Sequence, residues 1–240
     1  MPSRRPPILA SAPALDRIPM TRWLLRGGVA GPLVFVVGFV LIGAVRAGYD
    51  PIRQFVSLLS LTADGWLQTV NFLVTGALIV GGAIGLRRVL TSGPGSTWVP
   101  ILIGIAGIGI VLAGVFTTDP SQGYPLGAPA GVPTAYSTSG AIHQAVSTVV
   151  FFGLPIAAFV LARRFRNDGG YWATYCRGSG VGIVAFLIAA FSVPDVAGLL
   201  QRIAIMLAYG WIARVMWRFA HEADGVVSPA RGTGDAHRPR

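Results

Sequence analysis

The sequence predicts an all-α, polytopic membrane protein, a six-transmembrane-helix bundle with a short amphipathic helix in its first outer loop. Only 12% of the 240 residues are charged and 53% are hydrophobic, whereas a soluble domain usually carries about 25% charged residues. The charges collect in short stretches that separate long, almost uncharged apolar runs. About twenty apolar residues, wound as a helix, cross the roughly 30 Å of hydrocarbon in a bilayer.

Six apolar runs meet this length, and both tails are rich in Pro, Ala, Gly and Arg, a composition typical of disorder. We therefore expect a disordered cytoplasmic tail (1–22), a six-helix transmembrane domain (23–219) and a second disordered cytoplasmic tail (220–240). The expected spans are Leu24–Val45, Leu67–Leu86, Trp98–Phe116, Ile142–Ala162, Cys176–Val193 and Ala197–Phe219.

The first span is longer than the 7–15-residue apolar core of a cleaved signal peptide, so we expect it to remain in the chain. In the loop that follows, Pro51–Leu61 carries apolar residues at helical spacing, with Pro51 suited to the first turn. The apolar positions are Ile52, Phe55, Val56 and Leu59. We expect this segment to lie at the membrane interface or to cap the bundle.

Glycines recur at four-residue spacing within three of the spans, which allows close helix contact in lipid. The pairs are Gly27/Gly31, Gly81/Gly85 and Gly178/Gly182. We favour packing within the bundle over dimerisation. Pro194 breaks the chain between the fifth and sixth spans, and Asp195 is a candidate helix cap.

The arginines set the expected orientation. The chain has nineteen basic residues, all Arg, and sixteen of them lie in the two tails and the even-numbered loops. Positive residues accumulate on the cytoplasmic side of membrane proteins. We therefore expect a multi-pass protein of the plasma (inner) membrane with both termini cytoplasmic. Topology accounts for the basic balance, so we expect membrane lipids and no nucleic acid as partners. Cys176 is the only cysteine, which excludes an intrachain disulfide and a Cys-based metal site.

Asp119 and His143 stand at the outer ends of the third and fourth spans. A carboxylate at a helix C-terminus meets the negative end of the dipole and needs a donor. We expect neutral His143 to supply one across the two spans, with Ser147 one turn below. The alternatives remain that Asp119 only forms the turn before Pro120 and that His143 bonds a loop carbonyl.

Arg202 lies inside the sixth span, where a charge usually faces the bundle interior with a partner. Asp119 and Asp195 are its expected partners, and snorkelling to the interface is the alternative. Arg53 lies in the first outer loop. The polar residues thus converge on the extracytoplasmic face, where they predict a pocket.

Four segments in this order resemble the membrane protein family called domain of unknown function 998: SLLSLTADGWLQTVNFLVTGAL, GVFTTDP, GAIHQAVS and GLLQRIAIMLAYGW. The resemblance covers about Gly27 to Phe219. It implies a six-span bundle with a Gly-x-Phe and Asp element, a histidine opening the fourth span and a Gly-Leu-x-Gln-Arg element. Here these are Gly114, Phe116 and Asp119; His143; and Gly198, Leu199, Gln201 and Arg202. The resemblance implies a fold and a membrane location and no activity.

Three functions remain open. The first is a pocket that binds a lipid headgroup or a small polar or anionic ligand, or serves structurally. The second is a small-solute transporter, and the third is a membrane-embedded hydrolase or transferase with His143 as base and Asp119 as its orienting group. We expect no cofactor and no metal, because one histidine and scattered aspartates fall short of a zinc ligand set. The candidate ligand-binding residues are Asp119, His143, Arg202, Asp195, Arg53 and Gln201.

Overall fold

The structure, a computed structural model, describes residues 18–168 and 170–227. Six α-helices and three short 3-10 helices account for the regular structure, and no β-strand is present in these residues. The α-helices are α1 (Ile18–Val45), α2 (Trp66–Val89), α3 (Trp98–Val115), α4 (Thr138–Arg164), α5 (Trp172–Ser192) and α6 (Ala197–Val227). The 3-10 helices are η2 (Val56–Ser60), η3 (Ala63–Gly65) and η4 (Pro194–Val196).

All six predicted spans are confirmed as helices long and apolar enough to cross a membrane. Four of them, α1, α4, α5 and α6, reach at least four residues beyond the apolar runs. Helix α1 begins at Ile18 and α6 continues to Val227, so residues 18–22 and 220–227 of the two expected disordered tails are helical. Helix α4 begins at Thr138, because the Ser137 side chain caps it by accepting from Gly140 N at 3.0 Å. The remaining parts of both expected tails lie outside the described residues.

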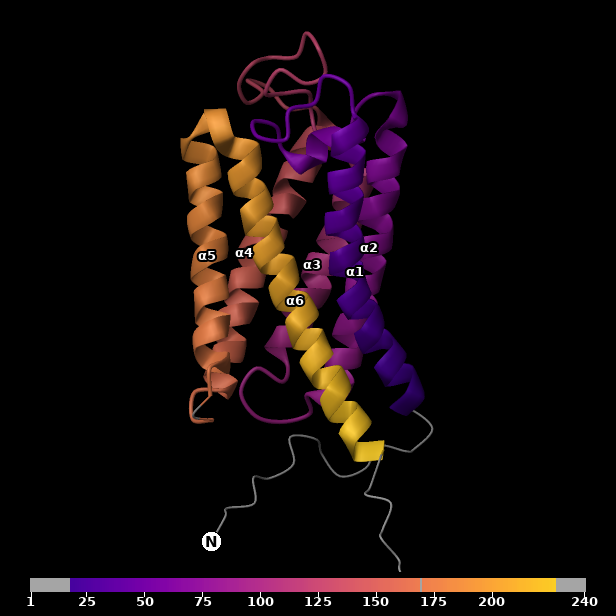
Figure 1. The fold of residues 1–240 in the computed structure, drawn as a ribbon, viewed down its shortest axis with the longest axis vertical. Helices are drawn as coiled ribbons and strands as arrows, with labels where there is room; N and C mark the ends of the chain where they lie inside the picture. Colours follow the sequence, from indigo (N-terminus) through magenta and orange to yellow (C-terminus); the bar gives the residue numbers. More distant parts are fainter. Residues whose placement is uncertain (1–17, 169, 228–240) are drawn as a thin grey trace, which may run out of the picture.

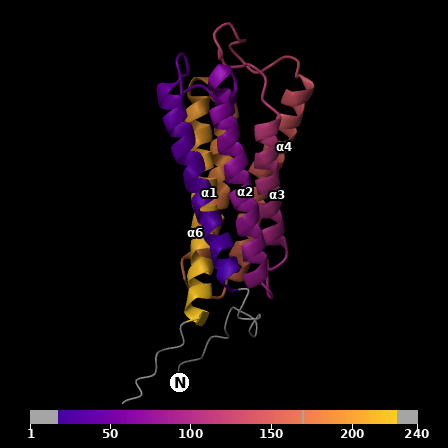
Figure 2. The same cartoon turned by 90° about the vertical axis from the view of Figure 1, so that its right-hand side faces the viewer.

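The six helices form a ring in chain order. Each packs against its neighbours in the sequence, and α6 returns to pack against α1 (Figures 1 and 2). Both ends of the described chain lie at one end of the ring, which we call the terminal end. The opposite end, which we call the loop end, carries the long connections 46–65 and 116–137 and the short turn 193–196 (Figure 1).

The outer surface of the ring is apolar on every helix. Large side chains such as Leu41, Ile108, Phe152 and Ile188 are more than half exposed. Such a surface is unfavourable in water and is expected of helices that face lipid. With six membrane-length helices, it makes the chain a multi-pass integral membrane protein.

Small residues bring α1 and α2 into contact. The two glycines that meet across these helices, Gly28 and Gly82, are not among the pairs expected from the sequence. A Cβ added to Gly28 would lie 2.8 Å from the Cα of Gly82, and one added to Gly31 would lie 2.9 Å from Leu78 Cβ. Of the expected pairs, Gly31 and Gly85 lie close to neighbouring helices, whereas a Cβ at Gly178 would meet nothing within 4 Å. Glycine therefore serves packing within the bundle, and at Gly28 and Gly82 it lets the two helix backbones touch.

We predict that Gly82→Ala destabilises the protein in detergent by ~1–3 kcal/mol, because its Cβ overlaps the α1 backbone and the helices must separate. Gly153→Ala is the matched control: it lies inside α4, and its Cβ would meet nothing within 4 Å. Melting temperatures of the two variants check this. Equal melting temperatures would show that α1 and α2 tolerate a wider separation.

Candidate functional site

The first loop contains the expected short helix in a different form. Within Pro51–Leu61 only Val56–Ser60 is helical, as the 3-10 helix η2, and turns precede it. Leu58 and Leu59 are buried, whereas Ile52 is 44% exposed. The segment therefore packs down onto the bundle and does not present one continuous apolar face from Ile52 onward.

The reason is that the backbone before η2 bonds to α6. The carbonyl oxygens of four consecutive residues, Pro51–Gln54, all accept hydrogen bonds from the first turns of α6, a contact that we call the α6 clamp. The pairs are Leu199 N with Ile52 O (2.9 Å), Gly198 N with Arg53 O (3.1 Å), and Arg202 Nη1 with Pro51 O (2.7 Å) and Gln54 O (2.8 Å). The clamp also satisfies backbone N–H groups that a helix N-terminus leaves free.

Gly198 is required for this approach. A Cβ at this position would lie 2.4 Å from Gln54 O and 2.7 Å from Pro51 O. Any other residue would push the first loop away from α6.

Arg202 is buried, with 9% of its surface exposed. Its Nη1 donates to Gly198 O (2.9 Å) as well as to the two loop carbonyls, and its Nη2 donates to the hydroxyl of Tyr49. The expected pairing of Arg202 with Asp119 or Asp195 is wrong: its hydrogen-bond partners are three carbonyls and a phenol. A ring of carbonyl dipoles offsets the cost of placing a cation close to the positive end of α6.

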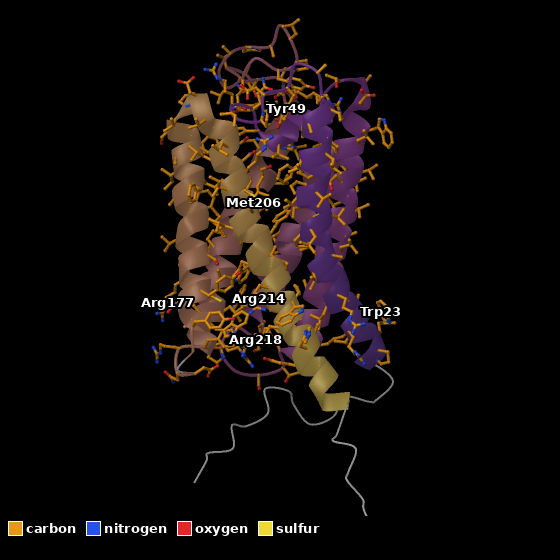
Figure 3. All side chains as sticks on the ribbon, in the orientation of Figure 1. Trp23, Tyr49, Arg177, Met206, Arg214 and Arg218 are labelled. Carbon is orange, nitrogen blue, oxygen red and sulfur yellow. The ribbon has the colours of Figure 1, made fainter. Side chains whose placement is uncertain are left out.

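Tyr49 completes the clamp beneath the loops (Figure 3). Its hydroxyl lies 3.2 Å from Gln54 O and 3.1 Å from Phe55 O, and its ring contacts Tyr124 edge-on at 5.4 Å between centroids. Burial raises the pKa of the Tyr49 phenol from its ordinary value of 10.0, more than the Arg202 guanidinium lowers it. The phenol therefore stays protonated and donates to the loop carbonyls.

The second long loop rests on the first through Gln122. Its backbone carbonyl accepts from Gln54 Nε2 at 3.1 Å, and its side-chain Oε1 accepts from Phe55 N at 2.9 Å. Gln122 adopts a φ of 52°, in the left-handed region. Gln201 holds the first loop from below, where its Oε1 accepts from Val56 N at 2.9 Å. The loops and α6 thus form one hydrogen-bonded layer across the loop end.

Arg53 and Asp195 form an ion pair at the surface of this layer. Arg53 Nη2 lies 2.9 Å from Asp195 Oδ1, and the two side chains are 61% and 82% exposed. Exposed pairs contribute about 0–1 kcal/mol. Asp195 is therefore the partner of Arg53, and Arg202 bonds to carbonyls instead.

Asp119 lies four residues beyond the end of α3, on the first turn of α4. Its Oδ2 accepts from Ser137 N at 3.0 Å, and a Cβ at Gly140 would lie 1.9 Å from the same oxygen. The negative charge thus meets the positive end of α4, where it is favourable. The expected conflict with the α3 dipole does not arise.

His143 lies in the second turn of α4 and is buried. Its Nδ1 lies 2.8 Å from Phe116 O and 3.0 Å from Ala113 O, the carbonyls that end α3. Both partners are acceptors, so Nδ1 carries the proton and donates. The expected hydrogen bond between Asp119 and His143 is therefore absent. The imidazole joins α4 to carbonyls of α3, and the carboxylate caps α4.

A cavity of about 220 Å³ lies beneath the two loops, and its lining comes chiefly from α4, α5 and α6, with single residues from α1 and α2. Its lining is mostly apolar, with His143, Ser147 and Gln201 among the polar groups and no Asp, Glu, Lys or Arg. Of the six expected ligand-binding residues, His143 and Gln201 line it. Arg202 belongs to the α6 clamp, and Asp119 caps α4. Arg53 and Asp195 pair with each other at the surface.

The cavity reaches the outside between α4 and α5. Its lining includes Gln144, Thr148 and Phe152, spaced four residues apart on the exposed side of α4, and Ile188 and Phe191 of α5. Figure 1 shows α4 and α5 side by side at the terminal end and apart at the loop end. The opening therefore faces the surroundings of the helices, which in a membrane is lipid.

The fold and this cavity define a class of protein: a six-helix integral membrane protein with a loop-capped cavity at one end. A family model described as "Protein of unknown function (DUF998)" matches residues 29–218, and the chain belongs to this family. No curated protein and no solved structure matches the chain. Across residues 18–168 and 170–227, no three His, Cys, Asp or Glu side chains are grouped to hold a metal ion.

We predict that Arg202→Gln destabilises the protein in detergent by ~3 kcal/mol or more, because hydrogen bonds to a charged donor are lost and buried carbonyls remain unsatisfied. Arg53→Gln keeps the backbone carbonyl of the clamp and removes only an exposed ion pair, so it should change stability by about 0–1 kcal/mol. Melting temperatures measure both. Similar small effects would mean that Arg202 does not hold the loop.

Proposed function

We propose that the protein binds an uncharged, hydroxyl-bearing amphiphile in the loop-end cavity. The observation that carries the proposal is the hydrogen bonding of the His143 ring, which fixes its tautomer. Its Nδ1–H is committed to two carbonyls, so Nε2 of the neutral ring is a hydrogen-bond acceptor. This acceptor belongs to a side chain that lines a cavity, and the lining contains no acidic or basic residue.

Gln201 supplies the complementary group. Its Oε1 is occupied by Val56 N, which leaves its amide NH₂ as a donor. A ligand hydroxyl both donates and accepts, so it matches His143 Nε2 and the Gln201 amide at once. The apolar remainder of the lining, including Phe151, Leu187 and Ile205, suits the chain of such a molecule. Long-chain alcohols, glycerides and isoprenols have this chemistry.

Entry from the bilayer follows from the position of the opening. Phe152, Ile188 and Phe191 are each more than half exposed and also line the cavity. An amphiphile in the adjoining leaflet meets an apolar surface there, with polar groups further inside. Its headgroup moves inward between α4 and α5, and the adjoining part of its chain follows into the apolar part of the cavity.

Other ligands and activities have less support. An anionic headgroup would need a free cation, but Arg202 is bonded to loop carbonyls and Arg53 to Asp195. Passage of a solute would need a path beyond the cavity, where Leu161, Trp211 and Ile212 are fully buried and fill the ring. Hydrolysis with His143 as base would need its orienting carboxylate, but Asp119 caps α4.

The protein is oriented with both termini in the cytoplasm of a cell whose plasma (inner) membrane it spans, and the cavity then belongs to the extracytoplasmic leaflet. The support is the arginine distribution together with the ring geometry. Sixteen of the nineteen arginines lie in the tails, in the connection between α4 and α5, or in the halves of the helices nearer the terminal end. Positive residues are retained on the cytoplasmic side during insertion.

We predict that a cysteine at Leu126 reacts with a membrane-impermeant maleimide on intact cells, whereas one at Asn167 reacts only after lysis. Leu126 is fully exposed in the second long loop, and Asn167 is exposed in the connection between α4 and α5. The native Cys176 is buried and gives little background. The reverse pattern of labelling would invert the orientation.

We predict that lipid extracts of the detergent-purified protein contain an uncharged hydroxyl lipid, identified by mass spectrometry. Ser147→Phe should lower its amount by about tenfold or more, because a ring in the cavity costs an occupant over ~1.4 kcal/mol. Ala145→Phe adds the same ring to the exposed side of α4 outside the cavity and should leave the amount unchanged.

Recovery of the same amount of this lipid from Ser147→Phe would show that the lipid does not bind in the cavity. Recovery of a charged lipid that Ser147→Phe abolishes would place a ligand in the cavity but refute the chemistry proposed for it.

A further inference from the structure

The loop-end cavity contains a hydroxyl group that has no partner in the part of the chain that the structure describes. Tyr209 of α6 lines the cavity, and only 5% of its surface is exposed. Its ring packs against Phe35 of α1, with 4.9 Å between the ring centroids. Across residues 18–168 and 170–227, no donor or acceptor forms a hydrogen bond with its hydroxyl. Buried tyrosine hydroxyls usually have a partner, so this one requires an explanation.

The hydroxyl oxygen of Tyr209 is in contact with open space. Tyr124 also has a buried hydroxyl without a partner, and protein atoms enclose its oxygen. The oxygen of Tyr209 is not enclosed in this way, although nearly all of the residue is covered. Since Tyr209 lines the cavity, we conclude that its hydroxyl faces the cavity.

Tyr209 lies deep in the cavity, far from the loops. Gln201, Ile205 and Ala208 precede it on the same face of α6, and all of them line the cavity. Tyr209 follows Gln201 by eight residues, which corresponds to about 12 Å along a helix. Met206, three residues before Tyr209, lies well below the loops in Figure 3. The cavity therefore has a polar end beneath the loops and a second polar group far from it.

The surroundings of this second polar group are apolar. Tyr209 lies twelve residues from the start of α6, and the residues at the corresponding distance on α4 are Val150, Phe151 and Leu154. All three line the cavity. A buried water typically makes about three hydrogen bonds, but here it would have one side-chain partner among the described residues. An oxygen atom that is carried by a ligand needs no further partner, because the rest of the ligand holds it in place.

From this arrangement, and on the basis of the function proposed above, we infer that Tyr209 selects ligands with a second oxygen atom in their apolar part. The ligand hydroxyl lies with His143 and Gln201 near the loops. An ether, ester or ketone oxygen about 10 Å further along the chain accepts a hydrogen bond from Tyr209, whose side chain leans toward the N-terminus of α6. Plain alcohols and isoprenols have no such oxygen and leave the Tyr209 hydroxyl unsatisfied.

The lateral opening allows one molecule to reach both positions. Phe152, which lines the cavity on the exposed side of α4, follows His143 by nine residues. This separation corresponds to about 13 Å along the helix. The opening thus extends to the depth of Tyr209, and the part of the chain beyond the second oxygen can remain in lipid.

The test compares two alcohols of equal length, heptadecanol and octyloxyoctanol, which has an ether oxygen in place of one mid-chain methylene. The full-length protein in detergent is incubated with an equimolar mixture and separated from free ligand by gel filtration. The bound alcohols are then extracted and quantified by mass spectrometry. We expect about fivefold more octyloxyoctanol than heptadecanol, the effect of one hydrogen bond. Tyr209→Phe should lower octyloxyoctanol to the level of heptadecanol.

Tyr124→Phe is the matched control, because it removes an unpartnered hydroxyl that does not line the cavity. It should keep the fivefold preference. Melting temperatures establish that each variant is folded. Tyr209→Phe should melt at the wild-type temperature without added alcohol, because its hydroxyl has no bond to lose and its ring keeps the contact with Phe35. Tyr49→Phe should melt lower, because it loses the bond to Arg202.

The outcomes separate this inference from the function on which it rests. Equal binding of the two alcohols, or a preference that Tyr209→Phe leaves unchanged, would overturn the role of Tyr209. Heptadecanol that binds the wild-type protein and is lost from Ser147→Phe would still support the proposed function. Binding of neither alcohol would overturn both. A lower melting temperature of Tyr209→Phe would show that the hydroxyl serves the fold and would also overturn the inference.

Discussion

A backbone polar group that is buried near hydrocarbon must find a hydrogen-bond partner within the protein, and this requirement shapes the loop end. The first loop cannot form one regular helix, because the carbonyls of Pro51–Gln54 face α6. Helix α6 meets them with donors of two kinds, its own first backbone amides and the guanidinium of Arg202. The guanidinium of Arg202 thus donates several hydrogen bonds to the folded loop. These bonds explain why the cation is buried without a carboxylate partner.

The layer fixed in this way forms the roof of the cavity. Gln201 lies one position before Arg202 and bonds to Val56, so the residue that faces the cavity also holds the loop above it. Gln122 extends the same layer into the second loop. On the opposite side, His143 joins α4 to the end of α3 through backbone carbonyls. The lining of the cavity and the hydrogen bonds that hold its roof and walls therefore involve the same side chains.

The sequence predicted the spans well and the polar contacts poorly, for one physical reason. Hydropathy acts over some twenty residues, so α3 and its neighbours could be placed to within a few positions. Arg202, Asp119 and His143 were correctly singled out as unusual, but their partners are mostly backbone groups. Every residue carries the same amide and carbonyl, so no pattern of side chains identifies them. Gly28 and Gly82 escaped notice similarly, because their contact depends on how two helices cross.

The ring of neighbouring helices also bears on how the protein is made. Because each helix packs mainly on the one synthesised just before it, a ribosome-bound chain can assemble in order as its segments leave the translocon. The ring stays open until the last span arrives, since only α6 joins the end of this series to α1. Arg202 thus enters the membrane when the first loop already offers its carbonyls. Closure of the ring and the bonding of Arg202 to the loop carbonyls therefore both depend on the arrival of the same helix.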